Sequence, residues 1–247
     1  MQQNQKKQVL LVGNPNVGKS TVFNALCNRK QKTGNYAGVT VSSHSGTYFF
    51  NNEEVEVIDL PGSYSLYPSS EDEAIFSKYL IDGQNSYAGV IYIVETLSLK
   101  RGLLLFQQIQ DLGIPMLLVV NQIDQAERRG ITIDTRKLSR SLGVDIIETN
   151  AKEQQGIDDI KTAVANNLFE KKDQPSFDIP AEHSDFVKKI ASAKNIDNEY
   201  NAWLSISFGK GLQKIDSLHD MLNEPDAKSL VPKRLQVQET VRRYQII

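Results

Sequence analysis

The chain has 247 residues, of which 40% are hydrophobic and 23% are charged. That length is enough for one ordinary α/β domain together with a smaller one. The 28 Lys and Arg residues nearly balance the 30 Asp and Glu residues, and a formal net charge of −2 excludes a general electrostatic attraction to nucleic acid, so no nucleic-acid partner is expected.

Strand-like and helix-like segments alternate along the first 170 residues, which is typical of an α/β fold: a mostly parallel sheet with helices on both faces. A tight antiparallel turn is expected at Asn51-Asn52. Strands are predicted at 8–13, 46–50, 54–59, 89–94, 116–120 and 144–147. Helices are predicted at 19–28, 70–81, 99–110, 134–142 and 156–168.

The first predicted strand leads into the motif G-x-x-x-x-G-K-[ST], which forms phosphate-binding loops between a buried strand and a helix. Gly13 and Gly18 let the backbone curl so that N–H groups point at phosphate oxygens. Lys19 is predicted to reach the β- and γ-phosphates, and Ser20 to ligate Mg²⁺. A chance match is the alternative, but strand, loop and helix agree, so nucleoside triphosphate binding is predicted. The nucleotide-binding residues predicted here are Gly13, Asn14, Pro15, Asn16, Val17, Gly18, Lys19, Ser20 and Thr21.

A second phosphate-side motif, Asp59-Leu60-Pro61-Gly62, follows the strand predicted at 54–59. Its position predicts that Asp59 lies beside Mg²⁺ and that the backbone N–H of Gly62 meets the γ-phosphate.

Two later motifs indicate the base. Asn121-Gln122-Ile123-Asp124 follows an apolar strand, and the Asp124 carboxylate can accept hydrogen bonds from both N1–H and the 2-amino group of guanine. Asn150-Ala151-Lys152 follows the last predicted strand and is expected to place backbone amides against the guanine oxygen. An isolated N-x-x-D is usually a solvated turn, whereas its combination with the phosphate motifs predicts guanine.

The pattern changes after Phe169. A polar, proline-bounded linker is predicted at 171–180, between a GTP-binding domain at 1–170 and a small all-helical domain at 181–247. Helical spacing in the last segment is carried by Phe186, Ile190 and Ala193, by Leu212, Ile215, Leu218 and Leu222, and by Leu235, Gln238 and Val241.

Cys27, the only cysteine, is expected to be a small buried residue of a protein from a reducing compartment. The three histidines lack the spacing of metal ligands, and the sequence has no apolar run long enough to cross a bilayer.

The phosphate loop, the segment Asn35-Tyr36-Ala37-Gly38-Val39-Thr40-Val41 and the run Asp59-Leu60-Pro61-Gly62-Ser63-Tyr64-Ser65-Leu66 together resemble the cytoplasmic G domain of the bacterial ferrous-iron transporter family FeoB, a P-loop GTPase of the Ras-like, TrmE-Era class. The resemblance covers essentially the whole chain. It implies a fragment at the cytoplasmic face of the bacterial inner membrane, whose partner is the transporter's own membrane domain. It also implies a helical domain that regulates GDP release; the alternatives are a spacer that transmits switch motion to the membrane and a packed helical cap that completes the core. The resemblance leaves open an oligomer formed through either domain.

The resemblance implies further site residues. Gly38, Val39 and Thr40 would contact the nucleotide, and Thr40 would coordinate Mg²⁺ and close over the γ-phosphate; its simpler role is to open a strand. Asn16 would hold K⁺ where other GTPases place an arginine finger, or it would only hydrogen-bond its own loop. Mg²⁺ and K⁺ are then the expected cofactors. The catalytic set is Asn16, Lys19, Thr40 and Gly62.

Four departures from the family pattern stand out. Gln122 replaces the common lysine, Asn150 replaces the usual serine, and Ser63 stands where small GTPases have a water-orienting glutamine. Val94-Glu95-Thr96-Leu97 occupies the place of an aspartate-alanine-threonine-like turn and has no assigned function. The alternatives are a ribosome-assembly or tRNA-modification GTPase and a GTP-binding module without turnover.

Overall fold

A computed structural model describes residues 7–27, 31–35, 42–82, 86–172, 174–208 and 231–247. The chain divides into two compact units, Met1–Lys172 and Asp173–Ile247. They are called the sheet unit and the helical unit below, and each is described by itself.

The sheet unit is built on one seven-stranded sheet in the order β2-β3-β4-β1-β5-β6-β7. β1 pairs in parallel with β4 and β5, and β6 pairs in parallel with β5 and β7, whereas β3 is antiparallel to β2 and β4. The mostly parallel sheet predicted from the sequence is therefore confirmed. The strands are β1 Lys7–Gly13, β2 Gln31–Asn35, β3 Ser42–Phe50, β4 Glu53–Asp59, β5 Gly89–Glu95, β6 Met116–Asn121 and β7 Ile146–Thr149.

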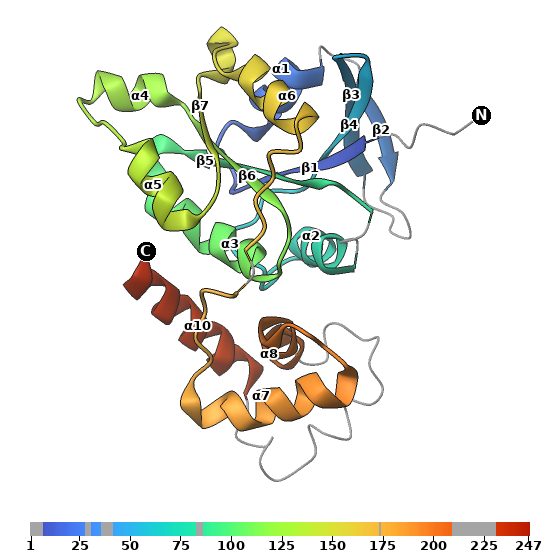
Figure 1. The fold of residues 1–247 in the computed structure, drawn as a ribbon, viewed down its shortest axis with the longest axis vertical. Helices are drawn as coiled ribbons and strands as arrows, with labels where there is room; N and C mark the ends of the chain where they lie inside the picture. The colour runs from blue at the N-terminus through green and yellow to red at the C-terminus, as the bar shows by residue number, and fades with distance from the viewer. Residues whose placement is uncertain (1–6, 28–30, 36–41, 83–85, 173, 209–230) are drawn as a thin grey trace. The chain divides into compact units, whose positions relative to one another are not determined.

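Helices cover both faces of this sheet, with α1 and α6 on one side and α2, α3 and α5 on the other (Figure 1). Because both faces are covered, the central strands β5 and β6 are almost continuously buried. The helices are α1 Lys19–Cys27, α2 Glu71–Asp82, α3 Leu99–Asp111, α4 Ile123–Arg128, α5 Thr135–Leu142 and α6 Ile157–Ala165, with short 3₁₀ turns η1 Thr96–Ser98 and η2 Ala151–Glu153.

The single cysteine lies at the end of α1 in the core of the sheet unit. A Cβ placed on Gly46 of β3 would come within 2.8 Å of the Cys27 sulfur, so the helix and strand approach closely there. Burial raises the pKa of the Cys27 thiol to about 12, with Asp59 acting in the same direction. The expectation of a small buried cysteine is confirmed.

Three local expectations for the sheet unit need correction. The last strand begins at Ile146 rather than at residue 144, because Val144 exchanges hydrogen bonds with Ser139 and so stays with the end of α5. No strand was expected at 31–35 and no helix at 123–128, yet both segments are ordered elements. The paired asparagines at 51 and 52 do form the expected turn, both at positive φ.

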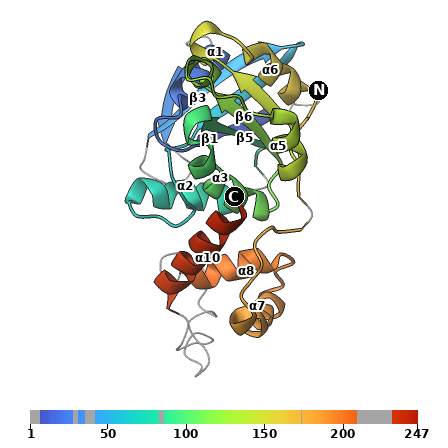
Figure 2. The same ribbon diagram turned by 90° about the vertical axis from the view of Figure 1, so that its left-hand side faces the viewer.

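The helical unit contains α7 Ala181–Lys194, α8 Glu199–Phe208 and α10 Pro232–Ile246. α8 contacts both α7 and α10 (Figure 2). The core of the helical unit includes Val187, Ile190 and Trp203. No helix in the described part of the chain combines the length and the apolarity needed to cross a bilayer.

The buried faces of two of these helices differ from those predicted. On α10 Leu235 is buried, but Val241 is 52% exposed and Gln238 is only partly buried. Glu239 and Arg243 are buried instead, because they form an ion pair with each other and Glu239 accepts hydrogen bonds from α8. On α7 Val187, Ile190 and Ala191 are buried, whereas the predicted Ala193 is exposed. Leu212, Ile215, Leu218 and Leu222 lie outside the described residues.

Candidate nucleotide-binding site

The phosphate loop connects β1 to α1, and close packing requires both of its glycines. A Cβ on Gly13 would lie 2.4 Å from the carbonyl oxygen of Ile93 on β5. Gly18 has φ +85°, and a Cβ there would lie 2.4 Å from Nδ2 of Asn121. The loop is therefore clamped between the ends of β5 and β6.

Lys19, the first residue of α1, connects the two phosphate-side motifs. Its ammonium group forms a salt bridge with Asp59 and donates to the carbonyl oxygen of Leu60 at 2.6 Å. Burial raises the pKa of Asp59 above its ordinary value, and the nearby Lys19 acts in the opposite direction. A Cβ on Gly62 would lie 3.0 Å from the backbone nitrogen of Pro15, so the Asp-x-Pro-Gly loop also touches the phosphate loop directly.

These two motifs line an open cavity of about 660 Å³. It is also lined by Ser69, Ser70, Asp72 and Glu73, just before and at the start of α2, which no sequence motif singled out. The sequence-predicted residues that line it are Asn14, Pro15, Asn16, Gly18, Lys19, Ser20, Thr21, Pro61 and Gly62.

The segment after Gly62 is tied together by one carboxylate. Glu73 accepts hydrogen bonds from the Ser63 hydroxyl at 3.2 Å and from the Ser69 backbone N–H at 2.8 Å. Although burial acts to raise it, these hydrogen bonds hold the pKa of Glu73 below its ordinary value. Ser63 is fully buried, and its single hydroxyl hydrogen is shared between Glu73 and the Ser65 carbonyl oxygen, which lies 2.7 Å away, so the residue at the glutamine position serves to fold this segment.

The base motifs meet at Asn121, the last residue of β6. Its Nδ2 donates to the carbonyl oxygen of Val17 at 3.0 Å. Its Oδ1 accepts from the Thr149 hydroxyl at 3.0 Å and from the Ala151 backbone N–H at 3.3 Å. The residue is 2% exposed. Asn121 therefore joins the phosphate loop, its own motif and the last motif.

The other predicted base residues follow the ends of β6 and β7. Gln122 adopts φ 63°, and Asp124 lies in the first turn of α4, where it pairs with the exposed Arg128 at 3.3 Å. Asn150 precedes η2 and is buried, whereas Lys152 is exposed. The phosphate loop and both base motifs thus lie at the carboxyl ends of parallel strands, where open α/β sheets bind ligands.

The predicted cofactor residues are described only in part. The Ser20 hydroxyl and the Asp59 carboxylate supply the hard oxygen donors that Mg²⁺ prefers, so the residues present fit that ion. No group of three or more His, Cys, Asp or Glu side chains that could hold a metal occurs within the described ranges. An Mg²⁺ ion shared with phosphate oxygens needs only one or two protein ligands. Gly38, Val39 and Thr40 lie outside the described residues.

Tyr92, on β5, contacts the phosphate loop at Asn14. Sequence analysis missed this residue because an aromatic residue inside an apolar strand is ordinarily part of the core. Its hydroxyl donates to the Gly102 carbonyl oxygen at 2.7 Å and lies 3.2 Å from Oδ1 of Asn14. The residue is fully buried, and burial raises the pKa of Tyr92 strongly.

Replacing Tyr92 with phenylalanine should lower the free energy of unfolding by about 1–3 kcal/mol, because a buried carbonyl oxygen loses its donor. Urea unfolding followed by circular dichroism measures this. Tyr87→Phe is the matched control, since the Tyr87 hydroxyl donates to Leu80 in a less buried place and should cost less. Equal losses for the two variants would contradict the assignment.

A phosphate loop after β1, an Asp-x-Pro-Gly loop bound to its lysine and a base motif at the end of β6 define a P-loop nucleotide-binding protein of the GTPase class. Residues 7–164 match the sequence family described as Ferrous iron transport protein B. The chain belongs to this family and represents its N-terminal GTPase domain.

Among curated relatives, the chain is 37% identical over 201 residues to the Fe(2+) transporter FeoB of Leptospira biflexa, covering 81% of this chain and 29% of that protein. It is 40% identical over 153 residues to the Fe(2+) transporter FeoB of Campylobacter jejuni, covering 62% of this chain and 25% of that protein. The chain thus spans less than a third of the length of these two relatives.

Solved structures agree with this family assignment. The cytosolic domain of L. pneumophila FeoB matches with a TM-score of 0.79 at 28% identity, over 97% of this chain and 98% of that one. A mutant of S. thermophilus NFeoB bound to mGDP matches with a TM-score of 0.80 at 25% identity, over 97% of both chains.

Proposed function

We propose that this chain binds GTP, hydrolyses it to GDP and phosphate, and acts as the cytoplasmic nucleotide switch of a ferrous-iron transporter whose membrane domain lies outside the chain. The observation that carries the proposal is the large cavity walled by the phosphate loop and the Asp-x-Pro-Gly loop, with Lys19 joining the two. The GDP and mGDP named for relatives of similar fold support guanine as the base.

The proposed mechanism uses the chain's own groups to hold and orient the triphosphate. Lys19 leaves Asp59 and binds the phosphates, while the Gly62 N–H meets the γ-phosphate. Ser20 and Asp59, and Thr40 as the family resemblance implies, would hold Mg²⁺, which would supply positive charge against the phosphates when bound. Since Ser63 offers no glutamine amide to orient water, turnover should be slow, on the order of 10⁻³ s⁻¹ or below, as in unassisted GTPases.

Phosphate release from GTP, with ATP as the control, tests the proposal. GTP-only turnover supports it. Binding of GTP without turnover would leave a nucleotide-binding module, and equal turnover of ATP would overturn the guanine assignment.

Asn16 is proposed to recruit K⁺. It lies at φ 68° on the rim of the cavity, it is exposed, and its side chain has no hydrogen bond to another described residue. Its amide oxygen is thus available to a monovalent cation beside the phosphates, where positive charge offsets charge developing in the transition state.

GTP hydrolysis should therefore be faster in KCl than in matched NaCl. In KCl, the Asn16→Ala variant should hydrolyse GTP at least roughly 10-fold more slowly than the unaltered chain. The Asn16→Ala variant should then hydrolyse GTP at the same rate in the two salts. Equal rates of the unaltered chain in the two salts would sink the K⁺ proposal while leaving the GTPase intact.

A further inference from the structure

The turn between β5 and α3 contains a polar residue to which the nucleotide motifs assign no role. Thr96, in η1, is 7% exposed, and its hydroxyl donates to the backbone carbonyl oxygen of Asn121 at 2.7 Å. β5 and β6 are paired in parallel up to Glu95 and Asn121, so this bond is made one residue beyond the last pair. The following residue, Gln122, turns to φ 63° and starts the entry into α4. Thr96 therefore holds the strand at the point where it leaves the sheet.

Hydrogen bonds therefore hold both the side chain and the backbone carbonyl of Asn121. Its side chain bonds to Val17, Thr149 and Ala151, while its backbone carbonyl bonds to Thr96. Movement of this carbonyl would move the entry into α4, which carries Asp124. It would also disturb the Oδ1 contact that places the Ala151 backbone. These are the two groups expected to meet the guanine edge.

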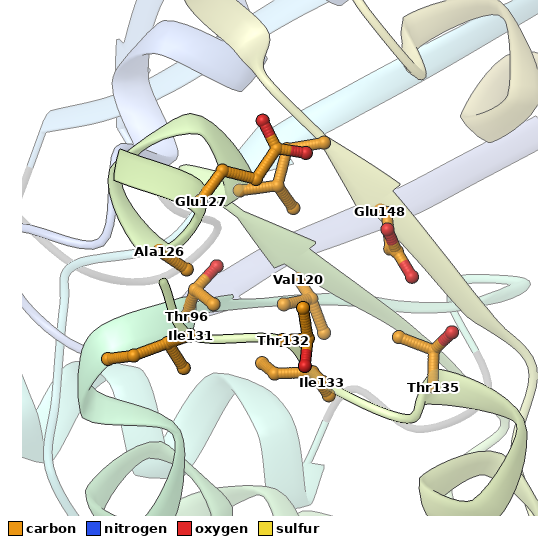
Figure 3. Close-up of a pocket in the computed structure, with 10 residues that line it drawn as sticks. Thr96, Val120, Ala126, Glu127, Ile131, Thr132, Ile133, Thr135 and Glu148 are labelled. Atoms are coloured by element: carbon orange, nitrogen blue, oxygen red, sulfur yellow. The ribbon is translucent and has the colours of Figure 1, made fainter. Parts of the chain in front are cut away.

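Packing on the other side of this strand end is incomplete. Thr96 lines a cavity of about 120 Å³ together with Val120, Ala126 and Glu148, and Figure 3 shows these side chains around an open space beside α4. On this side the strand end meets an open pocket rather than tightly packed protein atoms. The hydrogen bond from Thr96 thus supplies a fixed constraint where close packing does not.

We propose that Thr96 is a positioning residue for guanine recognition, acting through Asn121 rather than by touching the nucleotide. The inference rests on the proposed binding of guanine nucleotides. A purely structural hydrogen bond would stabilise the sheet equally for every ligand. A positioning bond should weaken GDP, whose base is expected to meet Asp124 and the Ala151 backbone, more than a ligand made only of phosphates, even though the Asn121 side chain also contacts the phosphate loop at Val17.

The test compares GDP with inorganic pyrophosphate, both with Mg²⁺, by isothermal titration calorimetry. Thr96→Val keeps the shape of the side chain and removes its donor. It should weaken GDP binding roughly 5- to 10-fold, because a buried carbonyl oxygen loses its partner, and it should weaken pyrophosphate binding less. Thr96→Ser keeps the hydroxyl and should restore GDP affinity.

Thr132→Val is the matched control. Thr132 lines the same cavity, and within the described residues its hydroxyl makes no hydrogen bond to Asn121, so this variant should bind GDP normally. Unchanged GDP affinity in Thr96→Val, or equal weakening of GDP and pyrophosphate, would overturn the inference. An unaltered chain that binds pyrophosphate but not GDP would overturn the guanine assignment, and the inference with it.

Discussion

Replacing Lys19 with alanine should lower GTP turnover by about 10²- to 10³-fold, the usual effect of removing one preorganised donor from a transition state. In the structure this ammonium group contacts both the Asp59 carboxylate and the Leu60 carbonyl oxygen. Without it, the described residues that line the cavity include no side-chain cation to meet phosphate charge, and Asp59 loses the group that opposes its raised pKa. Steady-state phosphate release at saturating GTP measures the effect.

Lys100→Ala provides the control, because Lys100 is an exposed lysine on α3 and does not line this cavity. It should keep the unaltered rate. A Lys19→Ala chain that retains a third or more of the activity would show that phosphate recognition rests elsewhere.

The second large effect is expected in the helical unit. Replacing Glu239 with glutamine should lower its free energy of unfolding by about 3–5 kcal/mol, because removing one charge leaves its buried partner uncompensated. Glu239 is 0% exposed and Arg243 is 1% exposed. Nε of Arg243 lies 2.8 Å from Oε1 of Glu239. The carboxylate also accepts from the Tyr200 hydroxyl at 2.8 Å and from the Trp203 indole N–H at 2.9 Å.

The fluorescence of a tryptophan in the helical unit measures this loss of stability. Trp203 is the chain's only tryptophan, and it contacts the altered residue, so fluorescence during urea unfolding follows the helical unit. Glu182→Gln is the control, since Glu182 is exposed and accepts a hydrogen bond from the Gln238 side chain; it should leave the unfolding curve essentially unchanged. A loss below about 1 kcal/mol for Glu239→Gln would mean that the ion pair and the aromatic donors can be replaced by neutral hydrogen bonds.

The features that were predictable from sequence share one property: they depend on neighbouring residues. The phosphate loop needs Gly13 and Gly18 at fixed spacing, and the structure gives each a close contact that excludes a Cβ. The apolar runs that became β1, β5 and β6 are buried on both faces, so their composition alone revealed them.

The features that were missed depend on residues far apart in the chain. Val241 has the spacing of a core residue but is exposed, because the contacts of Tyr200 and Trp203 with Glu239 rotate α10 toward its charged pair. Similarly, nothing adjacent to Asn121 indicates that its side chain joins Val17 to Ala151. Such roles follow from which strand ends the sheet brings together.

The single cysteine gives the sheet unit a counterpart to the tryptophan of the helical unit. Cys27 is buried and its pKa is raised to about 12, so its thiol is almost entirely protonated at neutral pH and shielded from alkylating reagents. Labelling of this residue requires the sheet unit to open. Each unit therefore carries one natural reporter of its own unfolding, and the rate of Cys27 alkylation measures how far a bound nucleotide protects the first unit while Trp203 independently follows the second.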